Sequence, residues 1–124
     1  MAKKLLFIVP ALPEIRVTKE NPKKHKKLFT LPYLGLLYLA AVTPKEFKIT
    51  IINEHISPID FDLETDIVGI TVMTPMAPRA YEISRIFRKR GVKTILGGLH
   101  PTYMTKEALR HCDCVVRGEA EGIW

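Results

Sequence analysis

Short runs of apolar residues recur along the chain and predict five β-strands. Lys4–Val9 is apolar throughout after its lysine and stops at Pro10, as is typical of a strand buried on both faces. Phe47–Asn53 first alternates between apolar and polar positions and then becomes β-branched, which also favours a strand. The remaining predicted strands are shorter: Ile67–Thr71, Val92–Leu96 and Cys112–Val116.

Helical patterns separate most of these strands. Residues 33–42, which follow Pro32, are apolar nearly all round and predict a buried helix that Pro44 ends. From Arg79 onward apolar residues fall on one helical face, and Gly91 is the expected stop. A short helix, Lys106–His111, is predicted with Thr105 as its cap. This order predicts a parallel, doubly wound α/β sheet with helices on both faces and a flavodoxin-like strand order.

The predicted sheet places several loops on one edge. Right-handed crossovers bring the turns that follow parallel strands together, and ligands bind at that edge near the switch in strand order. The segments expected there are 10–13, 71–76, 97–103 and 118–121, which are rich in small and hydroxyl-bearing residues. The adjacent glycines at 97 and 98 have two interpretations: a turn that needs a positive φ, or space for a ligand.

Composition indicates one globular domain over residues 1–124, since 47% of the residues are hydrophobic and 26% are charged. The net charge of +6 is local, because residues 1–30 hold eight basic and two acidic side chains. The long loop 10–31 is therefore basic. We favour a solvated loop over a lid on a ligand, and expect neither nucleic acid nor a membrane as partner.

Several classes of protein are excluded by what the motifs lack. The turn after the first strand, VPALPEI, has no glycine for a dinucleotide or a Walker loop, and Pro10 stands where a receiver domain needs an aspartate. Cys112 and Cys114 are too few for a zinc or iron–sulfur site and are expected to face the core. The longest apolar stretch is about half of the roughly 20 residues that cross a bilayer, and Pro10 cuts short any secretory leader, so a cytoplasmic protein is expected.

Four segments, in this order, carry a resemblance: LPYLGLLYLAAV, DIVGITVMT, ILGGLHPT and VVRGEAEGIW. They resemble the cobalamin-binding domain that precedes the catalytic barrel of many radical S-adenosylmethionine enzymes. The resemblance covers nearly the whole chain except the basic loop. Its most specific part is the GG-x-H-P turn followed about twenty residues later by G-E-x-E.

The resemblance implies a corrinoid lying across the carboxyl edge of the sheet. Thr71 and Thr74 would lie along its nucleotide tail, and Gly97 and Gly98 would leave space for the benzimidazole. The turn 99–101, together with 118 and 119, would border the ring. The full set of cofactor-binding residues implied is Pro10, Leu12, Thr71, Met73, Thr74, Gly97, Gly98, Leu99, His100, Pro101, Gly118 and Glu119. No catalytic residue and no metal ligand is assigned.

One departure concerns cobalt. Methyltransferases and mutases of this kind carry D-x-H-x-x-G after the first strand, and its histidine ligates the metal, whereas VPALPEI has no histidine. His55 follows the second strand and is not expected to replace it, nor is His100, which is expected to shape its turn or to bond a corrinoid amide.

The resemblance also implies a larger parent protein. In the family G-E-x-E leads to a barrel whose C-x-x-x-C-x-x-C motif holds a 4Fe–4S cluster and S-adenosylmethionine. This chain ends at Trp124. We therefore expect a fragment that is inactive alone and that carries the cofactor for a B12-dependent radical enzyme, such as a methyltransferase. The alternative is a non-catalytic α/β module with a degenerate ligand site, whose basic loop binds nucleic acid or an acidic partner.

Overall fold

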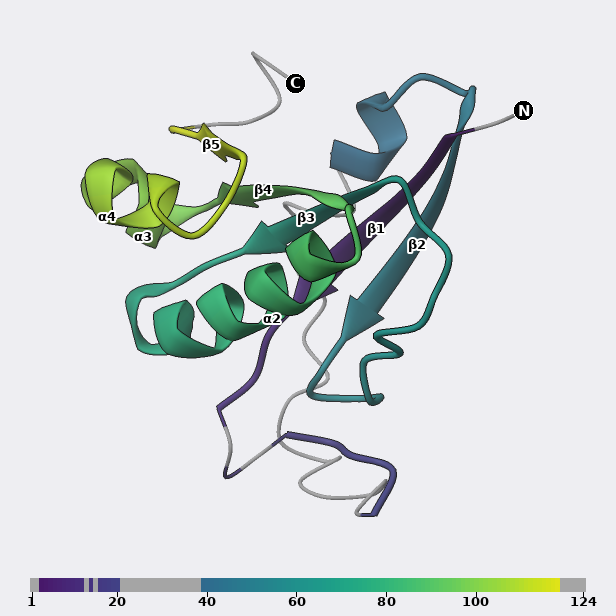
Figure 1. Cartoon of the computed structure of the whole chain (residues 1–124), viewed down its shortest axis with the longest axis horizontal. Helices are drawn as coiled ribbons and strands as arrows, with labels where there is room; N and C mark the ends of the chain where they lie inside the picture. Colours follow the sequence, from purple (N-terminus) through teal and green to yellow (C-terminus); the bar gives the residue numbers. More distant parts are fainter. Residues whose placement is uncertain (1–2, 13, 15, 21–38, 119–124) are drawn as a thin grey trace.

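The computed structural model of the protein describes residues 3–12, 14, 16–20 and 39–118. They contain one parallel sheet in the order β2-β1-β3-β4-β5 (Figure 1). The strands are β1 Lys3–Val9, β2 Phe47–Asn53, β3 Ile67–Thr71, β4 Lys93–Gly97 and β5 Cys114–Val116. This confirms the doubly wound α/β class, the flavodoxin-like order and, to within two residues at either end, all the predicted strands.

The register brings the carboxyl ends of the strands to one edge. Val9 of β1 lies opposite Asn53 of β2, Thr71 of β3 opposite Gly97 of β4, and Gly97 opposite Val116 of β5. All pairings are parallel, so the turns that follow the strands leave the sheet on the same side. The predicted common edge therefore exists, and it is called the rim below.

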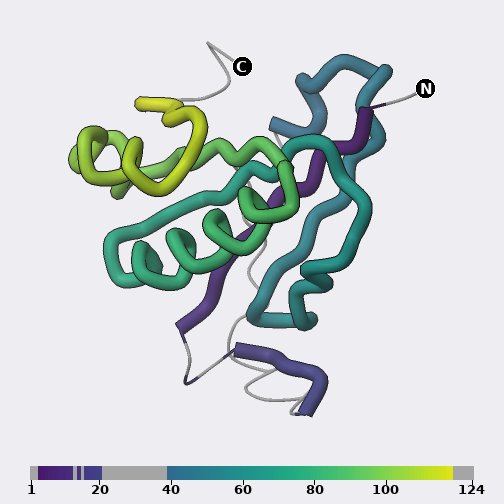
Figure 2. Tube along the Cα trace, in the orientation of Figure 1, coloured from purple at the N-terminus to yellow at the C-terminus, as the bar shows by residue number. Residues whose placement is uncertain are grey.

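Both faces of the central strands are buried because successive side chains of a strand point to opposite sides. Leu6 and Ile8 of β1 join a cluster with Ile83 and Phe87 of α2 (Ala77–Lys89). Leu5, Phe7 and Val9 join a second cluster with Leu39, which belongs to the helical residues 39–42. Figure 2 shows α2 running along one face of the sheet, with residues 39–42 on the other side.

Helix α2 ends where the sequence predicts. Gly91 has a φ of 82° and its N–H donates to Arg88 O at 3.0 Å, while Val92 N–H donates to Phe87 O at 3.1 Å. These two bonds form a Schellman motif, which satisfies carbonyls that the last turn leaves free. At its other end α2 begins two residues before the predicted Arg79, directly after a 3₁₀ turn, η1 (Thr74–Met76).

The segment after β4 differs from the prediction. It folds as two short helices, α3 Leu99–Tyr103 and α4 Thr105–Leu109, instead of a turn and one helix over 106–111. Thr105 lies inside α4, and its hydroxyl donates to Pro101 O at 2.7 Å. The prediction of Thr105 as a cap was therefore wrong, because this hydroxyl bonds back to the preceding turn.

The last strand is also shorter than predicted. Cys112 lies before β5 and is buried, with 4% of its surface exposed, whereas Cys114 lies in β5 and is exposed. The expectation that both cysteines face the core was wrong for Cys114, because β5 is the edge strand and Cys114 points away from the cluster around α2.

Parts of two predictions lie outside the described residues: most of the helix 33–42, whose described part is helical, and residues 21–31 of the basic loop. None of the helices in the described part of the chain is long and apolar enough to cross a membrane.

Candidate functional site

The turn after β4 is joined to the turn after β3 by backbone hydrogen bonds. Val72 N–H donates to Gly97 O at 2.8 Å, and His100 N–H donates to Val72 O at 3.0 Å. Gly98 lies between these bonds with a φ of 105°, and a Cβ there would stand 3.0 Å from Val72 O. The fold thus requires glycine at 98, which confirms the turn interpretation for this residue.

Gly97 is different. It has no positive φ, and a Cβ there would make only ordinary contacts, 3.7 Å from Val116 Cβ and 3.8 Å from Val116 O. A side chain at 97 would point to the sheet face opposite to that of Leu96, which packs in the cluster around α2. The described neighbours of Gly97 therefore do not demand glycine there, in contrast to Gly98.

His100 is buried behind the rim, with 6% of its surface exposed. Its Nε2 lies 2.9 Å from Tyr81 Oη and 2.8 Å from Glu107 Oε2, and its Nδ1 lies 3.3 Å from Thr74 Oγ1. Both ring nitrogens are engaged within the protein. The imidazole therefore connects the turn after β3, α2 and α4.

The protonation states around His100 follow from its neighbours. Burial, and then the hydrogen bond to Glu107, raise the pKa of the Tyr81 phenol, which donates to Glu107 Oε2 at 2.6 Å. The hydrogen bonds from Tyr81 and then His100 lower the pKa of Glu107. At neutral pH a protonated phenol and an ionised carboxylate face each other, which is the pairing that the donor geometry needs.

The turn after β5 is attached to the same place by Thr102. Its hydroxyl donates to Gly98 O at 2.8 Å and accepts from Gly118 N–H at 2.9 Å. Gly118 has a φ of 71°, and a Cβ there would meet no atom of the described residues within 4 Å. Predicted site residues from three turns are thereby brought together. Glu119, the last of them, lies outside the described residues.

Apolar side chains are exposed around these turns. Met73 is 49% exposed, Leu99 56% and Met104 47%, and Tyr103 is 78% exposed. Two hydroxyl-bearing residues lie among these apolar groups: Thr71, which is half-buried, and Thr74, which is exposed. Pro101 is buried. An apolar surface with a few polar groups is the usual composition of a cofactor site.

The loop after β1 is positioned by a buried carboxylate that sequence reasoning missed. Glu54 is 1% exposed, and its Oε1 accepts from Ala11 N–H at 3.0 Å and from Arg79 Nε at 3.1 Å. Arg16 Nε lies 3.5 Å from its other oxygen. The flanking predicted site residues, Pro10 and Leu12, are therefore held beside β3 at the rim. A charged residue directly after a predicted strand was the available signal.

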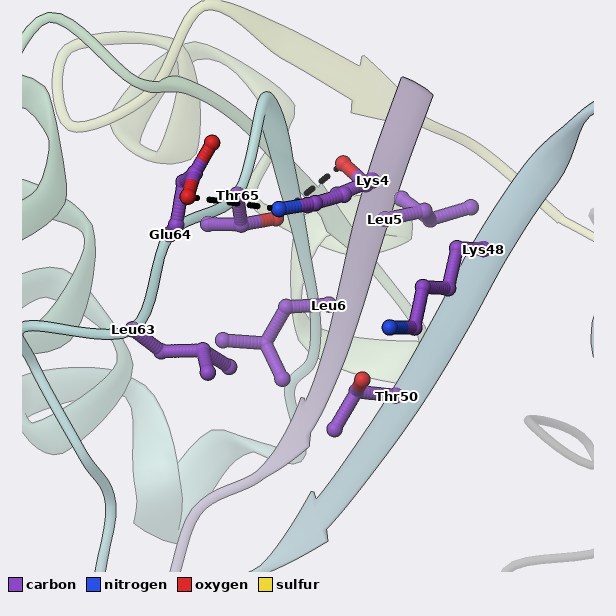
Figure 3. A pocket seen from close by; sticks show the side chains of 8 residues that line it. All are labelled: Lys4, Leu5, Leu6, Lys48, Thr50, Leu63, Glu64 and Thr65. Carbon is purple, nitrogen blue, oxygen red and sulfur yellow. Dashed lines mark hydrogen bonds and ion pairs between the residues drawn. The ribbon is translucent and has the colours of Figure 1, made fainter. Parts of the chain in front are cut away.

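Two further features lie apart from the joined turns after β3, β4 and β5. His55 is buried, with Nδ1 2.8 Å from Asn53 Oδ1, and burial lowers its pKa. A small pocket of about 130 Å³ lies at the opposite, amino edge of the sheet, where the Lys4 Nζ–Glu64 ion pair spans 3.3 Å (Figure 3). No group of three potential metal-ligating side chains occurs among residues 3–12, 14, 16–20 and 39–118.

Comparison with known proteins identifies the class that this fold and rim define. The chain belongs to the B12 binding domain family, which it matches over residues 26–123. This confirms the resemblance seen in the four sequence segments and assigns cobalamin as the cofactor. No solved structure matches the chain.

Curated relatives are much longer than this chain. It is 42% identical to the bacteriochlorophyllide d C-8(2)-methyltransferase of Chlorobaculum tepidum, over 85% of the chain and 23% of the relative. It is 37% identical to the bacteriochlorophyllide d C-12(1)-methyltransferase of the same organism, over 73% of the chain and 20% of the relative. It is 34% identical to an uncharacterized methyltransferase of Pyrococcus horikoshii, over 74% of the chain and 23% of the relative. The chain therefore spans less than a quarter of each of these proteins.

Proposed function

We propose that this chain is the cobalamin-holding module of a longer radical S-adenosylmethionine enzyme, with a methyltransferase as the parent. Three observations support the proposal: membership of the B12 binding domain family, the methyltransferase names of the relatives, and an apolar rim that includes Gly97, a glycine that its described neighbours do not demand. Gly97 is the observation that carries the proposal. A ligand explains a glycine that the fold itself does not need.

The described residues fit a corrinoid. Met73 and Leu99 offer exposed apolar contacts to the flat ring, and the hydroxyls of Thr71 and Thr74 offer hydrogen bonds to the phosphate or base of the tail. Gly97 leaves room for the benzimidazole. The remaining predicted contacts shape the surface or supply backbone groups to the ligand. These residues are Pro10, Leu12, Gly98, His100, Pro101 and Gly118.

When bound, the corrinoid supplies a cobalt that accepts and hands on a methyl group. The residues of this chain hold and orient it and keep water from its buried side. The network of His100, Tyr81 and Glu107 fixes the turn on which the cofactor rests. We assign no catalytic residue to the chain, and place S-adenosylmethionine and a 4Fe–4S cluster in a further domain of the parent.

Retention of hydroxocobalamin tests this function without any assay of activity. The purified chain is mixed with hydroxocobalamin, free ligand is removed, and the visible spectrum is recorded. We expect retained corrinoid in the wild type and loss in Gly97→Leu, where the side chain fills the space for the tail. Lys93→Leu is the matched control, since residue 93 is exposed on the same strand and face but at the amino end.

Two results would overturn the proposal. One is no retained corrinoid at tens of micromolar ligand while circular dichroism shows a folded wild type. The other is equal retention by Gly97→Leu and Lys93→Leu, which would place the cofactor elsewhere.

A further inference from the structure

A second concave surface lies on the solvent side of α2, away from the rim contacts. Its volume is about 370 Å³, within the range of small-molecule sites. Helix α2 contributes one wall, and the two residues that follow α4, Arg110 and His111, contribute the other. The lining residues are Tyr81, Arg85, Arg88, Lys89, Arg110 and His111. We call this surface the α2 groove.

The α2 groove carries an excess of positive charge. Arg88 lies 3.6 Å from Asp113 Oδ1, which is its acidic partner. The side chains of Arg85, Lys89 and Arg110 are exposed and have neither an ion pair nor a hydrogen bond to any described residue. Cations held this close repel one another, and an anion in the groove relieves that repulsion.

One wall of the groove is aromatic. The rings of Tyr81 and His111 stack with centroids 4.0 Å apart and planes 11° from parallel. The hydroxyl of Tyr81 is fixed by Glu107 and His100, so its ring is held in place before any ligand arrives. A planar ring system packs well on such a wall.

The charge is confined to this end of α2. A larger hollow of about 730 Å³ continues past Tyr81 and Arg85 to Pro75. Its two other arginines are neutralised, Arg79 by Glu54 and Glu82, and Arg16 by Glu54. A nucleic acid strand needs a basic path that follows successive phosphates. A single concave cluster of guanidinium groups instead matches one phosphate or diphosphate group, which arginine binds through paired hydrogen bonds.

We propose that the α2 groove binds a phosphorylated small molecule with a planar ring, of the size of a nucleotide. The phosphates contact Arg85, Arg110 and their neighbours, and the ring lies against His111. This site is separate from the cobalamin contacts on the rim, and none of its residues belongs to the predicted corrinoid set.

Isothermal titration of the purified chain in 150 mM NaCl tests the site. The probes are AMP, ADP, inorganic phosphate, adenosine and a ten-residue oligothymidylate. We expect ADP and AMP to bind. Adenosine lacks the phosphate and inorganic phosphate lacks the ring, so each should bind at least tenfold more weakly. Arg85→Gln/Arg110→Gln should weaken ADP by about tenfold or more. His111→Ala should weaken AMP more than inorganic phosphate.

The matched control is Lys45→Gln/Lys48→Gln, which removes two exposed positive charges at the start of β2 and should leave ADP binding unchanged. Circular dichroism and thermal unfolding establish that all variants fold. Absence of nucleotide binding at millimolar concentration would overturn the proposal, as would equal ADP affinity in Arg85→Gln/Arg110→Gln and wild type. If oligothymidylate binds more tightly than ADP and this binding is lost in Arg85→Gln/Arg110→Gln, the ligand of the groove is a nucleic acid and the nucleotide proposal is wrong. Hydroxocobalamin is absent from these titrations, so their outcome is independent of the cofactor on the rim.

Discussion

Two adjacent glycines in the turn after β4 have different reasons to be glycine. Gly98 has a φ of 105° and faces the backbone of Val72, so the chain itself needs it. A Cβ at Gly97 would make only ordinary contacts, with Val116. The sequence shows the pair as one motif, but only the structure separates a residue required by the fold from one available to a ligand.

The first prediction follows from this contrast. Gly98→Ala should lower the free energy of unfolding by about 1–3 kcal/mol, because it forces a left-handed conformation and a Cβ 3.0 Å from Val72 O. Gly97→Ala, the control, should change it by less than about 0.5 kcal/mol. Urea unfolding followed by circular dichroism measures both. Equal stability of the two variants would contradict the account of the turn.

The second prediction concerns Glu107 and pH. The hydrogen bonds from Tyr81 and His100 lower its pKa in the folded protein below the usual value of 4.5. The carboxylate therefore contributes stability above about that pH, and this contribution is lost as the pH falls through the folded pKa. Glu107→Gln should therefore be less stable than wild type at pH 6–7, and the difference should shrink below pH 4.5. Glu46→Gln, at an exposed turn, is the control. A difference that stays constant from pH 7 to pH 3 would contradict the assignment.

At the scale of elements, a buried carboxylate ties three parts of the chain together. Glu54, just after β2, bonds the loop after β1 through Ala11 and Arg16, and α2 through Arg79. These contacts join the edge strand to the first turn of α2 at the rim. They fix the position of the loop that carries Pro10 and Leu12.

The third prediction compares the two acidic partners of Arg79. Glu54→Gln should cost about 3–5 kcal/mol, because it removes the charge that offsets buried guanidinium groups. Glu82→Gln should cost about 0–1 kcal/mol, because Glu82 is 47% exposed and its pair is screened by water. Urea midpoints and m-values of the two variants give the comparison. Similar losses of unfolding free energy in the two variants would show that burial does not determine how much these ion pairs contribute to stability.

The elements also show what the sequence could and could not predict. The strands and α2 follow from local apolar patterns and from Gly91, and all were predicted. Helix α3 was not predicted, and α4 was predicted with other bounds, 106–111. The reason is that Thr102 and Thr105 bond back to the preceding turn. The partners of His100 lie 19 and 26 residues away at Tyr81 and Thr74, and Glu54 lies 25 residues from Arg79. No local pattern reveals such pairs.

At the scale of the whole molecule, the two edges of the sheet differ in character. The rim carries loops, glycines and exposed apolar groups, and the amino edge carries a small pocket with an ion pair between Lys4 and Glu64. Parallel strands impose this polarity, since every crossover must return to the amino edge. Of the two edges of the sheet, only the rim is therefore expected to hold the corrinoid.

The fourth prediction uses that polarity. Hydrogen exchange with and without hydroxocobalamin should show added protection in peptides covering 71–76 and 97–103, and none in peptides covering 61–66. The reason is that a bound ligand stabilises the segments it contacts and the local openings they undergo. Gly97→Leu should lose the protection. Protection centred on 61–66 would place the ligand at the wrong edge.

Tyr81 belongs to both surfaces of the molecule. Its ring stacks on His111 in the α2 groove, and its hydroxyl bonds His100 and Glu107 behind the rim. A shift of this one side chain changes both surfaces at once. If both proposed sites are filled, we expect their occupants to be linked through Tyr81, and by thermodynamic reciprocity each would alter the affinity of the other by the same factor. Tyr81→Phe, which keeps the stack and removes the hydroxyl, would leave both surfaces present but energetically independent.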